Sequence, residues 1–282
     1  MNPLSGPLTG PGSQPGEFDG SKLDYMIMPS GMMTYSAAHI PDTDEAASHA
    51  GALAVAQELL DMLRHAEQTG EGGRIDLADL SGDDIAFIDQ LLGEGEVSVV
   101  SGATVQAQES VLAGVWRVRL YGDTGMRVAD YVEVGAFPRD VLAAAFIDAQ
   151  QCVVMPTEFG PNVFNAPPLV AEINEHTARS REAGRLPHVI NLSLLPHTEE
   201  DLAFLDQVMG SGALIILSRG YGNCRIRATG TRDTWWVRYY NSQDTLILNS
   251  IEISPIPEVA LAAPEDIGDS AERLAEILEV YR

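Results

Sequence analysis

Two kinds of apolar spacing divide the chain into helices and strands. Apolar residues recur every three or four positions in the segments 43–67, 168–183 and 271–281. This spacing places them on one side of a helix, so each segment is predicted to be an amphipathic helix with one packed face. The first segment follows Pro41 and has acidic residues in its first turn, as helix starts commonly do.

Runs rich in β-branched and aromatic residues predict strands between and after these helices. Short strands are predicted at 74–77 and 188–192, each before a further helix. The connections between the longer runs are too short for crossover helices, so the strands are predicted to pair mainly antiparallel, with helices on one face. The longer runs are 97–100, 115–121, 131–134, 214–217, 235–240 and 246–253.

An internal repeat relates the two halves of this pattern. Identities in the first half return 117 positions later, and after a two-residue indel the match resumes at a shift of 119. The first stretch is Asp84, Ala86, Phe87, Asp89, Gln90, Gly93, Gly95 and Ser101, returning as Asp201, Ala203, Phe204, Asp206, Gln207, Gly210, Gly212 and Ser218. The second is Trp116, Val118, Arg119 and Tyr121, returning as Trp235, Val237, Arg238 and Tyr240. Chance rarely produces such a match.

Each copy contains a strand, a capped helix and a group of three strands. Ser81 with Asp84, and Thr198 with Asp201, occupy the N-cap and N3 positions of the two helices. A glycine follows each helix where a left-handed residue can end it. The predicted fold class is therefore α+β, with two tandem related helix-plus-antiparallel-strand units forming a duplicated, pseudo-twofold architecture.

Three segments follow from the repeat and from the start of the chain. Residues 1–22 intersperse prolines with glycines, lack an apolar period and are predicted to be a flexible Pro/Gly-rich arm. Residues 23–150 are predicted to be the first α+β repeat unit, and residues 151–282 the second. A chain of 282 residues has a length typical of about two domains, so each unit has enough sequence for a core.

The net charge and the short length of the apolar runs limit the kinds of partner and the cellular location that we expect. The chain has 41 acidic and 17 basic side chains, and its formal net charge of −24 repels phosphate backbones and anionic lipid surfaces. Nucleic acid is therefore not expected as a partner, whereas a basic segment would be attracted. No apolar run approaches the roughly 20 residues of a membrane-spanning helix, and the first residues lack the features of a signal peptide. A cytoplasmic protein without membrane insertion is expected.

No catalytic, cofactor or metal site stands out among the reactive side chains. Ser211 lies between glycines but follows a helix and precedes a strand, the reverse of a phosphate loop or a nucleophile elbow. The six histidines lack the spacing of a metal site. Cys152 and Cys224 lie in strand-like surroundings, where a buried and unreactive thiol is expected, although folding could bring them together. The chain is therefore predicted not to be an enzyme.

The segment 235–240 is the best candidate for a binding surface. Its pleat sends aromatic residues to both faces of the sheet, so at least one aromatic face has to be covered. Helices or the other unit could cover it, and so could a partner protein, because Trp, Tyr and Arg dominate binding hot spots. Substituting Trp236 and Tyr221 is expected to abolish partner capture without unfolding the protein. The candidate partner-binding residues are Arg219, Tyr221, Asn223, Trp236, Arg238 and Tyr240.

Several stretches form a set that is familiar from one protein family. The set comprises residues 10–15, residues 189–198 with Asp201, the sequence Ser-Arg-Gly-Tyr-Gly at 218–222, and Trp235, Val237, Arg238, Tyr239, Tyr240 and Asn241. Through this set the chain resembles the hydrogenase expression/formation proteins of the HupH/HyaF type. The similarity spans nearly the whole chain and is strongest from about residue 185 to 260.

The resemblance implies an accessory factor for maturation of an uptake nickel–iron hydrogenase. It implies an assembly chaperone that acts in the cytoplasm on the small, iron–sulfur subunit precursor before export by the twin-arginine route, with other maturation factors as further partners. It supplies no catalytic residue. Two alternatives stay open, namely an enzyme with carboxylates of raised pKa in a cleft between the units, and an iron–sulfur handling factor that uses Cys152 and Cys224.

Overall fold

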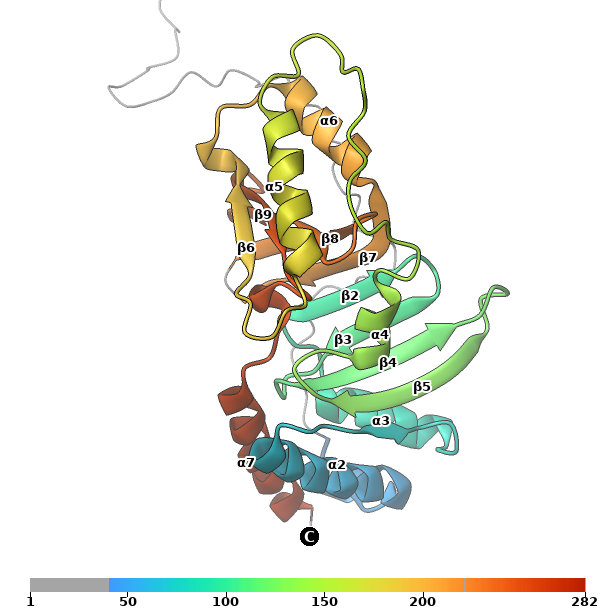
Figure 1. The fold of residues 1–282 in the computed structure, drawn as a ribbon. Helices are drawn as coiled ribbons and strands as arrows, with labels where there is room; N and C mark the ends of the chain where they lie inside the picture. Colours follow the sequence, from blue (N-terminus) through green and yellow to red (C-terminus); the bar gives the residue numbers. More distant parts are fainter. Residues whose placement is uncertain (1–40, 221, 282) are drawn as a thin grey trace, which may run out of the picture.

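The computed structural model describes residues 41–220 and 222–281, and the strands of this part join into one sheet (Figure 1). The strands are β1 (Arg74–Asp76), β2 (Val97–Ser101), β3 (Val105–Glu109), β4 (Val115–Tyr121), β5 (Arg127–Val134), β6 (His188–Asn191), β7 (Ser211–Ser218), β8 (Asn223–Thr229), β9 (Thr234–Tyr240) and β10 (Leu246–Ile253). Their order is β1-β5-β4-β3-β2-β7-β8-β9-β10-β6, and all neighbouring strands are antiparallel.

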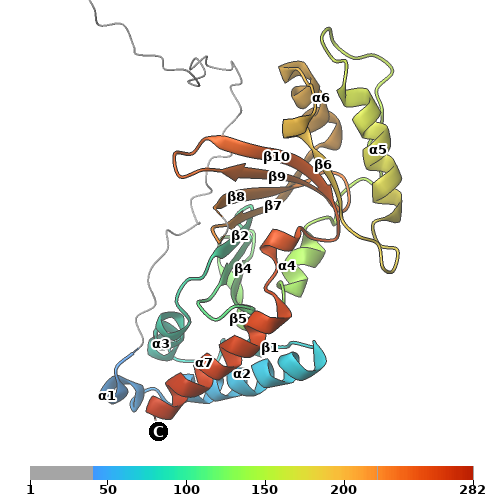
Figure 2. The same cartoon turned by 90° about the vertical axis from the view of Figure 1, so that its left-hand side faces the viewer.

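Helices gather at the two ends of this sheet (Figure 2). They are α1 (Thr43–Ala46), α2 (Ala50–Thr69), α3 (Gly82–Leu92), α4 (Arg139–Ala144), α5 (Ala166–Arg179), α6 (Glu199–Met209) and α7 (Pro264–Val280), with 3-10 turns η1 (Leu192–Leu194) and η2 (Glu258–Ala260). The helices α2, α3 and α7 lie at one end, α5 and α6 lie at the other, and α4 lies near the middle (Figure 1). The α+β fold class is confirmed.

The sheet is symmetrical about the contact between β2 and β7. Moving outward from it, the first half runs β2, β3, β4, β5 and β1, and the second runs β7, β8, β9, β10 and β6. These are the elements of the two sequence repeats in the same order, so the duplication and its pseudo-twofold are confirmed. Trp116 and Trp235 occupy equivalent places, because their Nε1 atoms donate to the backbone oxygens of Gly135 at 2.9 Å and Ser254 at 3.0 Å.

Four strands, rather than the predicted three, follow the helix of each repeat. The prediction lacks β3 and β8, because both alternate apolar residues with glutamine or arginine instead of forming continuous β-branched runs. In β8, Cys224 and Ile226 are buried while Arg225 and Arg227 are half-buried, which is the period-two pattern of a strand with one polar face. Asn223 begins β8 and therefore belongs to the sheet rather than to the preceding loop.

The predicted helix at 43–67 is interrupted at His49. The backbone there has a φ of −111° and a ψ of 55°, so α1 ends before α2 begins. The predicted helices at 168–183 and 271–281 correspond to α5 and α7. Cys152 is exposed in a bend rather than in strand-like surroundings, whereas Cys224 is buried in β8.

Apolar side chains form three clusters that cover both faces of the sheet. One face is packed by α2, α3 and α7 in the first half and by α5 and α6 in the second. The opposite face carries Trp116 and Trp235, and its middle is covered by side chains of α4 and the segment around η2. Helices were predicted on one face only, and the difference arises because the short α4, with buried Val141, packs on the other.

One aspartate in each repeat connects two helices. Asp201, at N3 of α6, is fully buried, and its Oδ1 accepts backbone N–H groups from Phe164, Asn165 and Ala166 at 2.8 to 3.0 Å. It thereby ties the start of α5 to α6. Asp84, the equivalent residue in α3, lies 3.1 Å from Nδ1 of His49, at the start of α2.

The last helix crosses back to the first half of the sheet. α7 packs along α2, and its Ile267, Ala271, Leu274 and Leu278 join the first core cluster (Figure 2). The second repeat unit therefore completes the core of the first. The division at residues 150 and 151 stays a prediction, and the predicted arm at 1–22 lies outside the described residues.

Candidate partner-binding surface

The sheet face between α3 and α6 carries two rows of side chains in cross-strand register. One row is Arg117, Gln108, Ser98, Leu217, Arg225 and Arg238. The other is Arg119, Gln106, Val100, Ile215, Arg227 and Trp236. We call these twelve residues the arginine face, because polar and cationic groups stand at both ends of an apolar middle. Side chains of adjacent strands that share a register pair project to the same side of the sheet.

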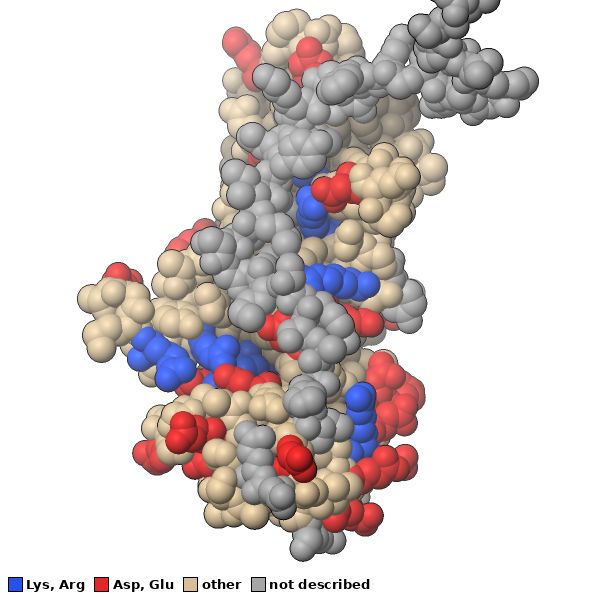
Figure 3. All heavy atoms as spheres, turned by 180° about the vertical axis from the view of Figure 1, so that it is seen from behind, with Lys and Arg blue, Asp and Glu red and all other residues tan. Residues whose placement is uncertain are grey.

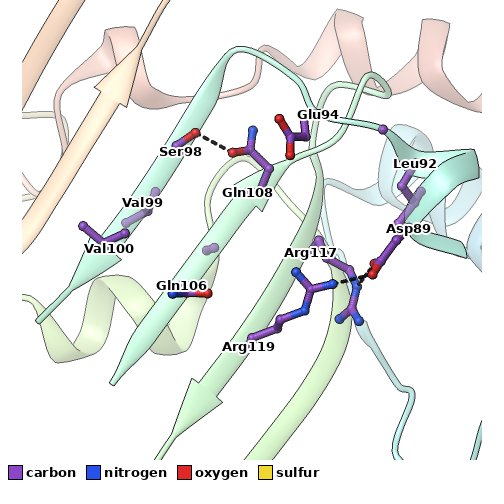
Figure 4. A pocket seen from close by; sticks show the side chains of 12 residues that line it. Asp89, Leu92, Glu94, Ser98, Val99, Val100, Gln106, Gln108, Arg117 and Arg119 are labelled. Carbon is purple, nitrogen blue, oxygen red and sulfur yellow. Dashed lines mark hydrogen bonds and ion pairs between the residues drawn. The ribbon is translucent and has the colours of Figure 1, made fainter. Parts of the chain in front are cut away.

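At the first-half end, one carboxylate of α3 holds two arginines. Asp89 accepts from Nε of Arg117 at 2.7 Å and from Nη2 of Arg119 at 2.5 Å, and Arg117 also pairs with Asp130. Burial would lower the pKa of Arg117, but these carboxylates outweigh burial and raise it. The arginines and Gln108 line a hollow of about 300 Å³, in which both guanidinium groups point toward Asp89 (Figure 4).

At the second-half end, arginines stack on aromatic rings. The guanidinium of Arg225 lies 4.3 Å from the ring centre of Tyr240, and that of Arg238 lies 4.8 Å from the ring centre of Trp236. Nη2 of Arg225 lies 2.8 Å from Oδ1 of Asp244. Arg227 pairs with Asp206 of α6. Since Asp89 and Asp206 are equivalent in the repeat, both ends use the same aspartate position to hold arginine.

Most arginines of this face are paired with carboxylates. Arg117, Arg119, Arg225 and Arg227 pair with Asp89, Asp130, Asp206 and Asp244. Among the described residues, Arg238 forms no ion pair with a carboxylate, although its exposed fraction is only 9%. Basic groups gather across the middle of the rear view, while acidic groups dominate its lower right edge (Figure 3). Glu94 also lines the hollow at the first-half end, so within the described part of the chain the uncompensated charge of this face is that of Arg238 at the second-half end.

The structure brings together most of the predicted partner-binding residues. Arg238 and Tyr240 project from β9, and Asn223 is the register partner of Tyr240 on β8. The backbone N–H of Arg219 donates to the carbonyl oxygen of Glu96 at 3.1 Å, where the chain leaves β7. Tyr221 lies outside the described residues. Whether these residues bind a partner stays a prediction.

Trp236 is part of the core rather than an open contact residue. Its exposed fraction is 2%, its Nε1 donates to Oδ1 of Asn249 at 2.6 Å, and it packs in the cluster of α5 and α6. We therefore expect its substitution to destabilise the fold, since truncating a buried Trp removes about 3–5 kcal/mol of packing. Helices cover this aromatic face, which was one of the two explanations the sequence allowed.

Sequence reasoning missed the arginines of β4 and β8 as members of the same surface. Arg225 and Arg227 alternate with buried residues, and that alternation is the signal that could have found them. The sequence repeat does identify Asp89 and Asp206 as equivalent positions. Their contacts with arginines depend on the register between strands and on the packing of α3 and α6, which composition and spacing do not reveal.

A second hollow of about 560 Å³ lies where the two repeats meet. Glu94, Glu96 and Glu109 line it from the first repeat, and Ser218 and Asp266 line it from the second. Burial raises the pKa of Glu109 to about 7, although the Gly114 N–H lowers it, and the charges of Glu96 and Asp266 raise it further. Several carboxylates thus line one hollow, and one of them has a pKa near neutrality, which are two features of an acid–base cleft.

The described residues offer little for metal or thiol chemistry. Among them, no group of three or more His, Cys, Asp or Glu side chains is arranged to hold a metal ion. Burial raises the pKa of the Cys224 thiol to about 12. The thiol therefore stays protonated near neutral pH, and a protonated thiol is a poor nucleophile and metal ligand. No helix in the described ranges combines the length and apolarity needed to cross a membrane.

The fold and the arginine face define a duplicated α+β protein with a candidate binding surface. Comparison with known proteins identifies its family. The family model described as HupH hydrogenase expression protein, C-terminal conserved region, matches residues 50–153 and again 163–281. The chain is 46% identical to the hydrogenase expression/formation protein HupH of Rhodobacter capsulatus, covering 96% of this chain and 95% of that protein. It is 43% identical to HoxQ of Cupriavidus necator, covering 99% and 98%.

More distant relatives carry related names. The hydrogenase-1 operon protein HyaF of Escherichia coli strain K12 is 38% identical, with 74% of each chain covered. A solved structure of a hydrogenase expression protein HupH from Thiobacillus denitrificans is 31% identical, covers 41% of this chain and 93% of that chain, and has a TM-score of 0.37. The chain belongs to the HupH family of hydrogenase expression proteins, as the sequence resemblance implied.

Proposed function

We propose that this protein is an assembly chaperone in maturation of an uptake nickel–iron hydrogenase. Family membership over nearly the whole chain carries the proposal, because its relatives are named hydrogenase expression or formation proteins. The proposed partner is the small, iron–sulfur subunit precursor, held in the cytoplasm before export. A rigid sheet with helices at both ends suits this role, because it presents preformed surfaces.

Direct capture tests the identity of the partner. Tagged protein is mixed with purified small-subunit precursor, with the same subunit lacking its leader, and with the large subunit. The precursor should be retained and the large subunit should not. Retention of the large subunit alone would contradict the proposal.

Salt dependence tests the contribution of charge. Because the chain is strongly acidic, capture of a precursor with a basic leader should weaken as salt rises from about 0.05 M to several hundred millimolar, where exposed charges are screened. Titration calorimetry at each salt concentration measures the dissociation constant. The subunit without its leader serves as the control, and its binding should change less with salt.

The hollow between the repeats favours a second candidate function, acid–base catalysis by Glu109. Its carboxyl has a pKa raised to about 7, a value suited to proton transfer near neutral pH. Glu109→Gln preserves shape but cannot exchange a proton. A catalytic Glu109 predicts about a hundredfold loss of maturation rate with capture intact, whereas an assembly chaperone predicts hydrogenase maturation unchanged.

A further inference from the structure

Two arginines face each other directly across the pair of strands β8 and β9. Arg225 and Arg238 are register partners, so their Cα atoms stand about 5 Å apart on the same face of the sheet. Like charges in this position destabilise a sheet. Asp244 balances Arg225, but it is half-exposed at the β9–β10 turn and leaves Arg238 without an ion pair among the described residues. One of the two positive charges is therefore not balanced by an ion pair among the described residues, and it lies close to the other positive charge.

The same pair has hydrogen-bond donors without acceptors. Nε of Arg225 and Nε of Arg238 are both buried and lack a hydrogen-bond partner in the described structure. Arg238 is more than nine-tenths buried. Burial lowers its pKa, and the charge of Arg227 lowers it further against an opposing effect of Tyr240. A buried guanidinium with an unused N–H is costly, so an acceptor at this place would gain more than one at the open surface.

Aromatic rings hold both guanidinium groups in position. Arg225 lies over Tyr240, and Arg238 lies over Trp236, whose indole is fixed by its bond to Asn249. Stacking limits the motion of the planar fork, so less entropy is lost when it binds a planar acceptor. Arg and Tyr beside a buried Trp are the residue types that dominate binding hot spots.

We propose that Arg225 and Arg238, at one end of the arginine face, bind a single carboxylate carried by a segment of a partner protein. A carboxylate matches the planar fork, and the single unbalanced charge suits one acidic side chain rather than a polyanion. Nucleic acid or polyphosphate would be repelled by the net charge of −24. The inference rests on the proposed function for the identity of the partner protein, but the chemistry of the site does not depend on it.

A peptide experiment tests the site without any hydrogenase subunit. The probe is a short fluorescein-labelled peptide with one glutamate flanked by tyrosine and glycine, and fluorescence anisotropy measures its binding to the full chain. Matched peptides carry glutamine or lysine in place of glutamate. The glutamate peptide should bind at least about tenfold more tightly than the glutamine peptide, and the lysine peptide should not bind at this face.

Protein variants assign the binding to this face. Arg225→Gln and Arg238→Gln should each weaken binding of the glutamate peptide about tenfold. Arg179→Gln is the matched control, because it removes the same charge from an exposed residue of α5. If a variant fails to fold, binding of the three peptides to the unaltered protein still shows whether a carboxylate is required. Equal binding of the glutamate and glutamine peptides, equal effects of the control, or tighter binding of polyphosphate would each overturn the proposal.

Discussion

At the scale of single residues, Asp201 shows how one carboxylate can fix the relation between two helices. Its capping box with Thr198 starts α6, and its other oxygen collects the free N–H groups at the start of α5. Helix starts leave N–H groups unsatisfied, so a buried start needs such an acceptor. Burial alone would raise the pKa of Asp201, but the backbone donors outweigh burial and lower it.

Asp201→Asn should lower the free energy of unfolding by about 2–4 kcal/mol, because buried N–H groups lose their ionised acceptor. The folded pKa of Asp201 is below the unfolded value, so its stabilisation is complete above pH of about 4 and is lost as pH falls through the folded pKa. Urea unfolding at pH 7 and pH 3 measures this. Asp84→Asn is the matched control, with a smaller loss expected because Asp84 is partly exposed.

Glu109 should give the opposite pH dependence. Its folded pKa of about 7 exceeds the unfolded value, so burying the charged form is unfavourable above pH 7, and this penalty fades as pH falls toward the unfolded pKa. Glu109→Gln should therefore exceed the natural protein in stability at pH 8 by up to about 3 kcal/mol, with no difference near pH 4. Thermal unfolding across this range measures it. Glu279→Gln, an exposed control, should leave the pH dependence unchanged.

At the scale of elements, the order of strands follows from the repeat, while the contacts of the last helix do not. The amphipathic pattern of α7 predicts a helix with one packed face, yet it cannot say which sheet half that face covers. Leu274 is fully buried against the cluster formed by α2 and α3. The second unit thus supplies a wall of the first core.

Leu274→Ala should destabilise the first half of the sheet, although the residue belongs to the second repeat. Removing this buried side chain should lower the free energy of unfolding by about 2–5 kcal/mol. Hydrogen exchange of the backbone amides of β4 and β5 reports the first half during urea unfolding. Arg273→Ala on the exposed side of the same helix is the control and should change stability little. An equal effect of both substitutions would contradict the packing of α7.

The sequence predicted the helices, most strands and the duplication because each depends on local spacing or on identities between the copies. It missed β3 and β8, whose alternating polar residues resemble loop composition. It proposed Trp236, Arg238 and Tyr240 from residue type and from the period-two alternation of the strand. Which side of Trp236 is covered, and that Asp89 reaches Arg117 and Arg119, depends on strand register and helix packing, which no local pattern encodes.

At the scale of the whole molecule, β2 and β7 join the halves without a break. Their register pairs run from Val97 with Ser218 to Ser101 with Leu214, and one apolar cluster continues across the contact. With α7 bridging the other face, few surfaces remain along which the halves could separate. The described chain is therefore expected to unfold as one cooperative unit.

Unfolding followed by separate probes should give a single transition. Hydrogen exchange of the β4 amides reports the first half, that of the β9 amides reports the second, and circular dichroism reports the whole sheet. Their midpoints in urea should coincide, because loss of either half exposes the β2–β7 contact and the core beneath it. Midpoints that differ beyond experimental error would show that the halves unfold independently.

The join between β2 and β7 has one more consequence. A lone copy would leave β2 as an open edge, and closing it by pairing with an identical copy would place the same side chains at both ends of the face. Tethering two copies in one chain lifts that restriction. β3 can then carry Gln106 and Gln108 where the equivalent strand β8 carries Arg225 and Arg227. The two ends of the face therefore differ, and a bound segment is held in one orientation.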